Sequence, residues 1–215
     1  MKAGITCCDP RGNVMSNLQA SGTTTTPNVA VGPAGRALAQ PMDPALLDAL
    51  QQHLTMERRA SAFYFANALW FGERELRGFS KFFHGESQSE STHAASFADY
   101  LVARGQTVQL EEIGAPRQSW ESFEEVMAAS FLLEADVTAS LQQLYSLAER
   151  SSDTRTTVFL DPIMEGQIQS EHEFAHLLGR VRFAGEQAAA LLILDAELAE
   201  GNNNPYYLGE RFSNG

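Results

Sequence analysis

The chain has 215 residues, of which 44% are hydrophobic, and its formal net charge is −12. This length and composition allow one domain with a sizeable core. The negative charge excludes a nucleic-acid partner, because phosphates require a basic surface, and it suits a protein that concentrates cations. No apolar run is long enough to span a membrane, so no membrane partner is expected.

Residues 1–35 are rich in Thr, Gly and Asn and lack the apolar segment of a secretory signal. Three interpretations remain open: a disordered tail, a miscalled start with the true start at Met15, and a plastid transit segment. The two cysteines, Cys7 and Cys8, are neighbours in this segment, so they form neither a disulfide framework nor a metal knuckle. A cytoplasmic location is the simpler expectation, with the plastid stroma as the alternative.

The first predicted helix spans about residues 44–72. Asp43 is a suitable N-cap and Pro44 suits the first helical position. Apolar residues recur every three or four positions, which indicates one buried face. Glu57 occupies a position on that face where an apolar side chain is expected. The face comprises Leu47, Leu50, Leu54, Glu57, Ser61, Tyr64, Ala68 and Phe71.

The second predicted helix spans about residues 79–105 and carries two polar residues on its inward face. Glu90 precedes His93 by three positions, which puts two potential metal ligands on the same side of the helix. A buried carboxylate is costly unless it is paired or binds a metal. The inward face comprises Phe79, Phe82, Phe83, Glu86, Glu90, His93, Phe97 and Tyr100.

Residues 106–120 show no helical period, and such a long irregular segment is unusual inside a compact domain. About fifteen extended residues can span about 50 Å, more than the length of about 40 Å of a 27-residue helix. The segment is therefore predicted to cross over along the bundle. The second and third helices would then run parallel to each other.

Three further helices are predicted, at about 122–150, 153–185 and 187–200. The third has the inward residues Met127, Phe131, Glu134, Thr138, Leu141, Tyr145 and Ala148; the fourth has Leu160, Ile163, Gln167, Ser170, Phe174, Leu177 and Val181. The fifth is more apolar than a surface helix, and it packs either on its own bundle or on a neighbouring chain. Residues 201–215 are expected to form a loose tail.

Each of the four long helices carries polar residues near its middle, where a four-helix bundle has its core. A single Glu on such a face usually reaches water from the edge, and a lone His is more often a hydrogen-bonded core residue than a ligand. Because polar residues lie at a similar depth on all four helices, a shared site is the better interpretation. A site with mainly hard oxygen donors suits two iron or manganese ions. Its expected members are Glu57, Glu90, His93, Glu134 and Gln167.

Four segments resemble the non-haem ferritins of the bacterial and cyanobacterial type. These are residues 55–64, 90–94, 133–136 and 165–168. The resemblance covers residues 36–200 and implies an all-α, ferritin-like four-helix bundle with one long crossover between helices 2 and 3. It also implies a short fifth helix that meets its symmetry mates at the four-fold axes of a 24-chain cage, a homo-oligomer.

The resemblance implies a role for each site residue. Glu57 and His93 hold the first iron, Glu90 bridges both irons, and Glu134 holds the second. Gln167 lies beside the second iron and the oxygen site. Tyr64 matches a tyrosine next to the centre, with two roles left open: it orients a ligand carboxylate, or it also donates an electron. The implied cofactor is a pair of iron ions.

The chain also departs from related di-iron bundles. The fourth helix has Gln167 and Ser170 where symmetric bundles have a second Glu-x-x-His. Glu173 and His176 have that spacing but lie off the inward face, which indicates a surface position. Ser91 and Thr92 replace the haem methionine of bacterioferritin, so no haem is expected. Ser89 occupies the position of a carboxylate that many ferritins place just before the bridging Glu, and the family's third-site glutamates fall on Gln169 and Ser170. Glu86 and Glu171 are possible accessory ligands.

The implied function is iron storage with ferroxidase activity, in which dioxygen oxidises Fe(II) to Fe(III) and the product is mineralised inside a hollow cage. Two alternatives remain open: a soluble di-iron oxidoreductase or peroxidase without bulk storage, and a non-enzymatic helical structural or adaptor protein. The iron route is undecided as well. The family's channel positions fall on Thr157 and Leu160, with Asp153 and Asp161 nearby.

Overall fold

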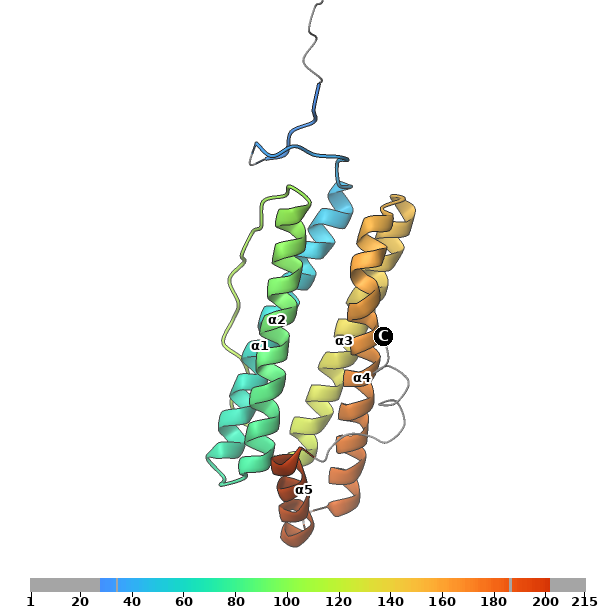
Figure 1. The fold of residues 1–215 in the computed structure, drawn as a ribbon. Helices are drawn as coiled ribbons and strands as arrows, with labels where there is room; N and C mark the ends of the chain where they lie inside the picture. The colour runs from blue at the N-terminus through green and yellow to red at the C-terminus, as the bar shows by residue number, and fades with distance from the viewer. Residues whose placement is uncertain (1–27, 34, 186, 202–215) are drawn as a thin grey trace, which may run out of the picture.

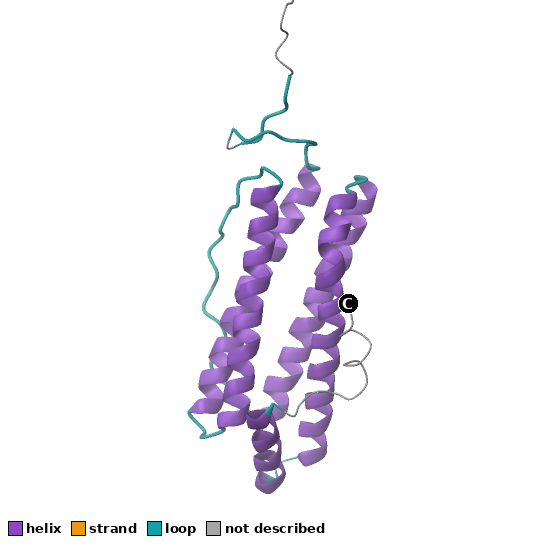
Figure 2. Cartoon of the chain, in the orientation of Figure 1, coloured by secondary structure: helices purple, strands orange, loops and turns teal. Residues whose placement is uncertain are grey.

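The computed structural model describes residues 28–33, 35–185 and 187–201, and most of these residues are helical (Figure 1). The helices are α1 (Pro44–Gly72), α2 (Arg77–Ala103), α3 (Phe123–Arg150), α4 (Thr154–Ala184) and α5 (Ala188–Glu200). Figure 2 shows how the loops connect these helices. Within the described residues the only β geometry is an isolated bridge between Val31 and Ala37. The predicted all-α fold is therefore confirmed, and each helix end lies within two residues of its expected position.

Most of the two expected tails, residues 1–27 and 202–215, lies outside the described part of the chain. None of the described helices is long and apolar enough to cross a membrane.

Side-chain caps set the beginnings of three helices. Asp43 Oδ1 accepts hydrogen bonds from the backbone N–H groups of Ala45 and Leu46, at 2.9 and 3.1 Å. Ser122 caps α3 and Asp153 caps α4 in the same manner. These caps satisfy backbone donors that the first helical turn leaves without partners.

The four long helices form two antiparallel hairpins, α1 with α2 and α3 with α4 (Figure 1). Residues 104–122 run along the outside of the bundle, so α2 and α3 are parallel, as the length of this segment predicts. Side chains of α1 hold the crossover in place. Gln51 bonds the backbone of Thr107 and Gln109, at 3.3 and 2.7 Å, and Arg58 donates to the backbone oxygen of Glu111 at 2.7 Å.

The core consists of two apolar clusters separated along the bundle. One is aromatic, with Phe71 stacked on Phe79 and Phe83 at centroid distances of 4.8 and 5.3 Å. The other is mainly aliphatic and comprises Leu46, Leu50, Leu54, Leu101, Leu141 and Leu160 with their neighbours. On each long helix the central polar residues fall between the segments that supply these clusters. The bundle therefore has a central polar layer between two apolar clusters. This polar layer contains Glu57, Glu90, His93, Glu134 and Gln167.

Helix α5 packs one face on its own bundle. Leu191, Leu194 and Leu198 are buried, whereas Leu192 and Ile193 are each 59% exposed. The helix approaches α2 so closely that a Cβ at Gly78 would lie 1.7 Å from the backbone oxygen of Asp195. One half of this apolar helix therefore covers the chain's own core, as one of the two interpretations predicts, and the other half faces outward.

A buried ion pair joins the end of α2 to the start of α4. Arg104 donates to both carboxylate oxygens of Asp153, at 3.0 and 2.6 Å, and to Thr156 Oγ1 at 3.2 Å. Asp153 is only 3% exposed. Since breaking a buried pair leaves an uncompensated charge, this contact fixes how the two hairpins meet at that end.

Candidate metal centre

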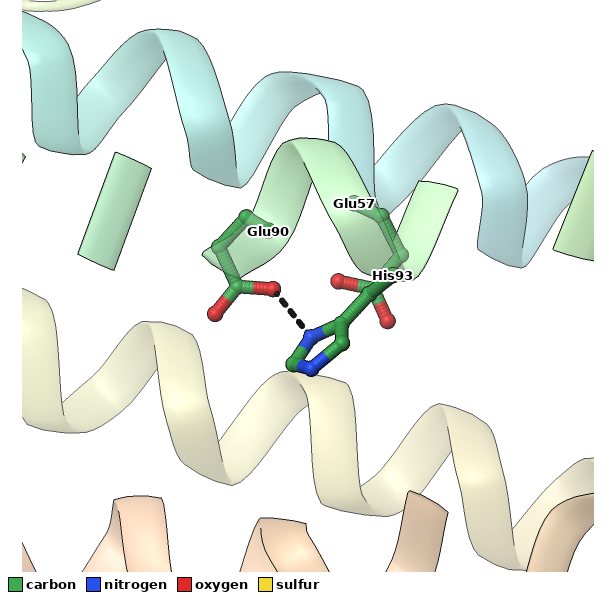
Figure 3. Close-up of side chains that lie close together, drawn as sticks. All are labelled: Glu57, Glu90 and His93. Atoms are coloured by element: carbon green, nitrogen blue, oxygen red, sulfur yellow. Dashed lines mark hydrogen bonds and ion pairs between the residues drawn. The ribbon is translucent and has the colours of Figure 1, made fainter. Parts of the chain in front are cut away.

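Glu57 from α1 and Glu90 and His93 from α2 point toward one another in the polar layer (Figure 3). One ligand atom of each residue lies within 4.8 Å of the ligand atoms of the other two. His93 Nδ1 is 3.0 Å from Glu90 Oε2. Both carboxylates are buried, whereas the imidazole is half-buried. This arrangement offers oxygen and nitrogen donors to a single divalent cation.

One carboxylate oxygen in this group lacks a partner. Glu57 is 1% exposed, and among the described residues its Oε2 atom has no N–H or alcohol O–H donor; its nearest polar neighbour is another carboxyl group, that of Glu90. Burial raises the pKa of Glu57 above its usual range. A buried acceptor without a donor is unfavourable, and a bound cation would compensate it. The donor set and this free oxygen together fit a metal ion.

Glu134 on α3 and Gln167 on α4 form the other half of the polar layer. The Gln167 amide donates to Glu134 Oε2 at 2.8 Å and to the backbone oxygen of Glu134 at 3.1 Å. The hydroxyl of Tyr64 donates to the other oxygen, Oε1. Glu134 is not part of the three-residue group of Glu57, Glu90 and His93. Two donors from different helices thus fix the Glu134 carboxylate.

Electrostatic interactions connect Glu134 to the group of Glu57, Glu90 and His93. Burial, reinforced by the charge of Glu90, raises the pKa of Glu134 to about 7. Burial likewise raises the pKa of Glu90 to about 7. The hydrogen bond with Glu90 raises the pKa of His93. With their pKa values raised in this way, protons compete with cations for these carboxylates near neutral pH.

The two possible accessory ligands lie in different surroundings. Burial, and next the charge of Glu173, raises the pKa of Glu86 to about 8. Glu171 instead accepts a hydrogen bond from the Thr138 hydroxyl on α3. Glu173 is half-buried near Glu86, which corrects the predicted surface position, whereas His176 is exposed as predicted. Glu86 therefore has Glu173, and not Glu171, as its main acidic neighbour.

His53 is a polar residue of this layer that the sequence pattern missed. It is fully buried on α1, one turn before Glu57, and its Nε2 lies 2.8 Å from Glu57 Oε1. Its Nδ1 lies 2.8 Å from Ser140 Oγ on α3. Burial lowers the pKa of His53 to about 4, so the ring is neutral near pH 7. The spacing of four residues to Glu57 was the available signal.

Two of the candidate positions for iron entry are unsuited to line a channel. Leu160 is fully buried in the aliphatic cluster. The Asp153 carboxylate forms the ion pair with Arg104 and also caps the N-terminus of α4. Asp161 is exposed and accepts a hydrogen bond from the Tyr145 hydroxyl at 2.7 Å. Of the two acids near the start of α4, only Asp161 faces outward.

Comparison with known proteins agrees with this fold. The ferritin-like domain family matches residues 47–184. A bacterial non-heme ferritin of Staphylococcus haemolyticus is 27% identical over 154 residues, which cover 72% of this chain and 93% of that protein. Another, from Staphylococcus epidermidis, is 28% identical over 159 residues, which cover 74% of this chain and 96% of that protein.

Solved structures give the same result. An open pore ferritin from the archaeon Archaeoglobus fulgidus superposes with a TM-score of 0.72 at 27% sequence identity, covering 74% of this chain and 98% of that one. A humanized archaeal ferritin also has a TM-score of 0.72, at 28% identity. Together with the crossover topology and the polar layer, these matches establish that the chain belongs to the ferritin family and is similar to bacterial non-haem ferritins.

Proposed function

We propose that this protein stores iron and acts as a ferroxidase, oxidising Fe(II) with dioxygen at a di-iron centre within each chain. The observation that carries the proposal is the buried, unpartnered Oε2 of Glu57 beside Glu90 and His93. Membership of the ferritin family supports iron handling at the level of the family. Iron is the substrate of the reaction and the stored cargo.

Each site residue has a proposed role. Glu57 and His93 bind the first Fe(II), and Glu90 is shared between the two ions. Glu134 binds the second ion, with Gln167 beside it. Glu86 and Glu171 remain candidates for accessory binding. The anionic oxygen donors stabilise Fe(III) relative to Fe(II), which favours loss of an electron from each ion.

The overall reaction consumes two electrons and two protons. Two Fe(II) ions give up one electron each, and dioxygen takes up both electrons with two protons to form hydrogen peroxide. Glu90 and Glu134 have pKa values near 7 and release protons when cations bind. Because these carboxylates are deprotonated once they bind the cations, the two protons taken up with dioxygen come from solvent. Tyr64 keeps the Glu134 carboxylate in place through its hydrogen bond.

The assembly proposed for storage is a 24-chain hollow cage in the cytoplasm, with Fe(II) and dioxygen as the small partners. The exposed face of α5, formed by Leu192 and Ile193, is suited to contact other chains. The relatives named above are bacterial or archaeal, which favours the cytoplasm over the plastid stroma. No haem is proposed, because Ser91 and Thr92 offer no thioether ligand.

Aerobic loading of the purified metal-free assembly with Fe(II) tests the function. Storage predicts that iron retained after gel filtration far exceeds about two ions per chain. Retention of about two per chain would favour the alternative of a di-iron oxidoreductase or peroxidase. No retained iron would favour a structural or adaptor protein. Glu57→Gln is the matched variant, since it keeps the side-chain volume and removes the anionic ligand.

A further inference from the structure

We propose that His53 is a positioning residue of the metal centre: it holds Glu57 by Oε1, so that Oε2 stays free to bind the metal. This inference rests on the proposed function. It concerns a residue outside the cluster of potential ligands, which comprises Glu57, Glu90 and His93.

His53 lies between two groups on different helices. Its Nε2 is 2.8 Å from Glu57 Oε1, one turn further along α1. Its Nδ1 is 2.8 Å from Ser140 Oγ, which α3 supplies from across the bundle. The imidazole therefore lies within hydrogen-bond distance of both the Glu57 carboxylate and a hydroxyl on the other hairpin.

The chemistry of the two partners fixes the direction of these contacts. A carboxylate that binds a cation can only accept, so the proton of the neutral ring belongs on Nε2, facing Glu57. Nδ1 is then an acceptor, and the Ser140 hydroxyl is its donor. Outer groups of this kind orient metal ligands, and their loss commonly lowers metal affinity.

The ring has little freedom to adopt another arrangement. His53 is 0% exposed, and its ring packs against Phe97 on α2 with a centroid distance of 4.4 Å. Nε2 lies 2.8 Å from Oε1 without the alignment of a hydrogen bond, and neither Nε2 nor Glu57 Oε2 has a hydrogen-bond partner among the described residues. The two unsatisfied atoms belong to adjacent side chains. A cation on Oε2 and a hydrogen bond to Oε1 would satisfy both.

The experiment uses two variants of His53 that separate its two contacts. The amide nitrogen of Gln can reach the position of Nε2, so His53→Gln keeps a donor toward Glu57. The shorter side chain of Asn reaches only the position of Nδ1, so His53→Asn keeps a partner for Ser140 and loses the donor. Ser140→Ala removes the far end of the link. Ser130→Ala is the control, because among the described residues this buried hydroxyl bonds only the Val126 backbone oxygen, within α3.

The readout is anaerobic titration of the metal-free assembly with Co(II), followed by visible absorption and calorimetry. We expect His53→Asn to weaken Co(II) binding by about 10- to 100-fold and His53→Gln to weaken it by less than about tenfold. Ser140→Ala should weaken binding a few-fold, and Ser130→Ala should leave it unchanged. The thermal melting of each metal-free variant is recorded alongside, to verify that it is folded.

Two results would overturn the positioning role. One is Co(II) binding by His53→Asn at wild-type affinity. The other is equal weakening in both His53 variants together with a changed ligand-field spectrum, which would make His53 itself a ligand. Failure of the proposed function looks different: the wild type would bind no Co(II), or Glu57→Gln would bind it as tightly as the wild type, and both proposals would then fall.

Discussion

The hydroxyl of Tyr64 on α1 donates a hydrogen bond to the carboxylate of Glu134 on α3, across the centre of the bundle. The tyrosine ring is fully buried and stacks on Phe174 at a centroid distance of 5.3 Å and an interplanar angle of 6°. Burial, followed by the charge of Glu134, raises the pKa of the Tyr64 phenol. The phenol therefore stays protonated and in contact with a proposed iron ligand.

Replacing Tyr64 by Phe should distinguish its two possible roles. The variant keeps the packing and removes the hydrogen bond and the readily oxidised phenol. If Tyr64 donates an electron, freeze-quench electron paramagnetic resonance of the wild type shows a transient tyrosyl radical, which Tyr64→Phe lacks. If Tyr64 only orients Glu134, neither protein gives the signal and the variant oxidises iron more slowly. A radical that persists in Tyr64→Phe would assign the donor role to Tyr100, Tyr145 or a tryptophan.

The second prediction concerns the proposed bridging ligand. Glu90→Ala should lower the initial rate of iron oxidation by at least about 100-fold, because it removes an oxygen donor shared by both ions. The fold should persist, since the change also relieves repulsion among buried carboxylates. Stopped-flow absorbance at about two Fe(II) per chain measures the rate, with exposed Asp99→Ala on the same helix as the control. An undiminished rate in Glu90→Ala would remove Glu90 from the centre.

The third prediction is a fall in the stability of the metal-free protein as the pH rises. Burial raises the pKa values of Glu90 and Glu134 to about 7, so the folded state binds more protons than the unfolded state between about pH 4.5 and pH 7. The free energy of unfolding therefore decreases across this window as these groups ionise. Calorimetry should give a lower melting temperature at about pH 8 than at about pH 6.

The control for the pH prediction is the double variant Glu90→Gln, Glu134→Gln, in which the decrease should be smaller. Metal affinity should change in the opposite direction and rise with pH, because bound cations displace the same protons. A melting temperature that is flat or rises over this range would show that the two carboxyl groups are ionised in the folded, metal-free protein.

The fourth prediction separates the two faces of α5. Leu192→Glu with Ile193→Glu charges the exposed face and should reduce the size of the assembly in sedimentation velocity, while the helix content is unchanged. The uncharged pair Leu192→Gln with Ile193→Gln is the matched control. Leu194→Ala should instead destabilise the chain by about 2–4 kcal/mol, because Leu194 is buried on its own bundle. An undisturbed assembly in the doubly charged variant would exclude this face as a contact between chains.

The sequence predicted the helices and the crossover well because both depend on local features. Pro44 and Asp43 mark the start of α1, and the length of the segment 106–120 determines which helices run parallel. Glu57 and Glu134 were recognisable since each interrupts an apolar face of a long helix. Their burial follows from helical periodicity alone.

Features that depend on contacts between helices were harder to predict. His53 was missed because Leu50 and Leu54 already supplied an apolar face, and only the packed bundle brings Ser140 to the imidazole. In the first turn of α1 the fully buried residue is Leu46, whereas the predicted Leu47 is half-buried. The inward orientation of the Asp153 side chain likewise depends on its ion pair with Arg104, which is 49 positions away in the chain.

Anomalous diffraction at the iron edge, from crystals soaked with Fe(II) without oxygen, tests the central claim most directly. The account predicts two iron peaks per chain in the polar layer. One should be bound by Glu57 and His93, the other by Glu134, with Glu90 between them and His53 hydrogen-bonded to the oxygen of Glu57 that faces away from the metal. Iron found only at surface carboxylates, with no peak within bonding distance of Glu57, would contradict the account.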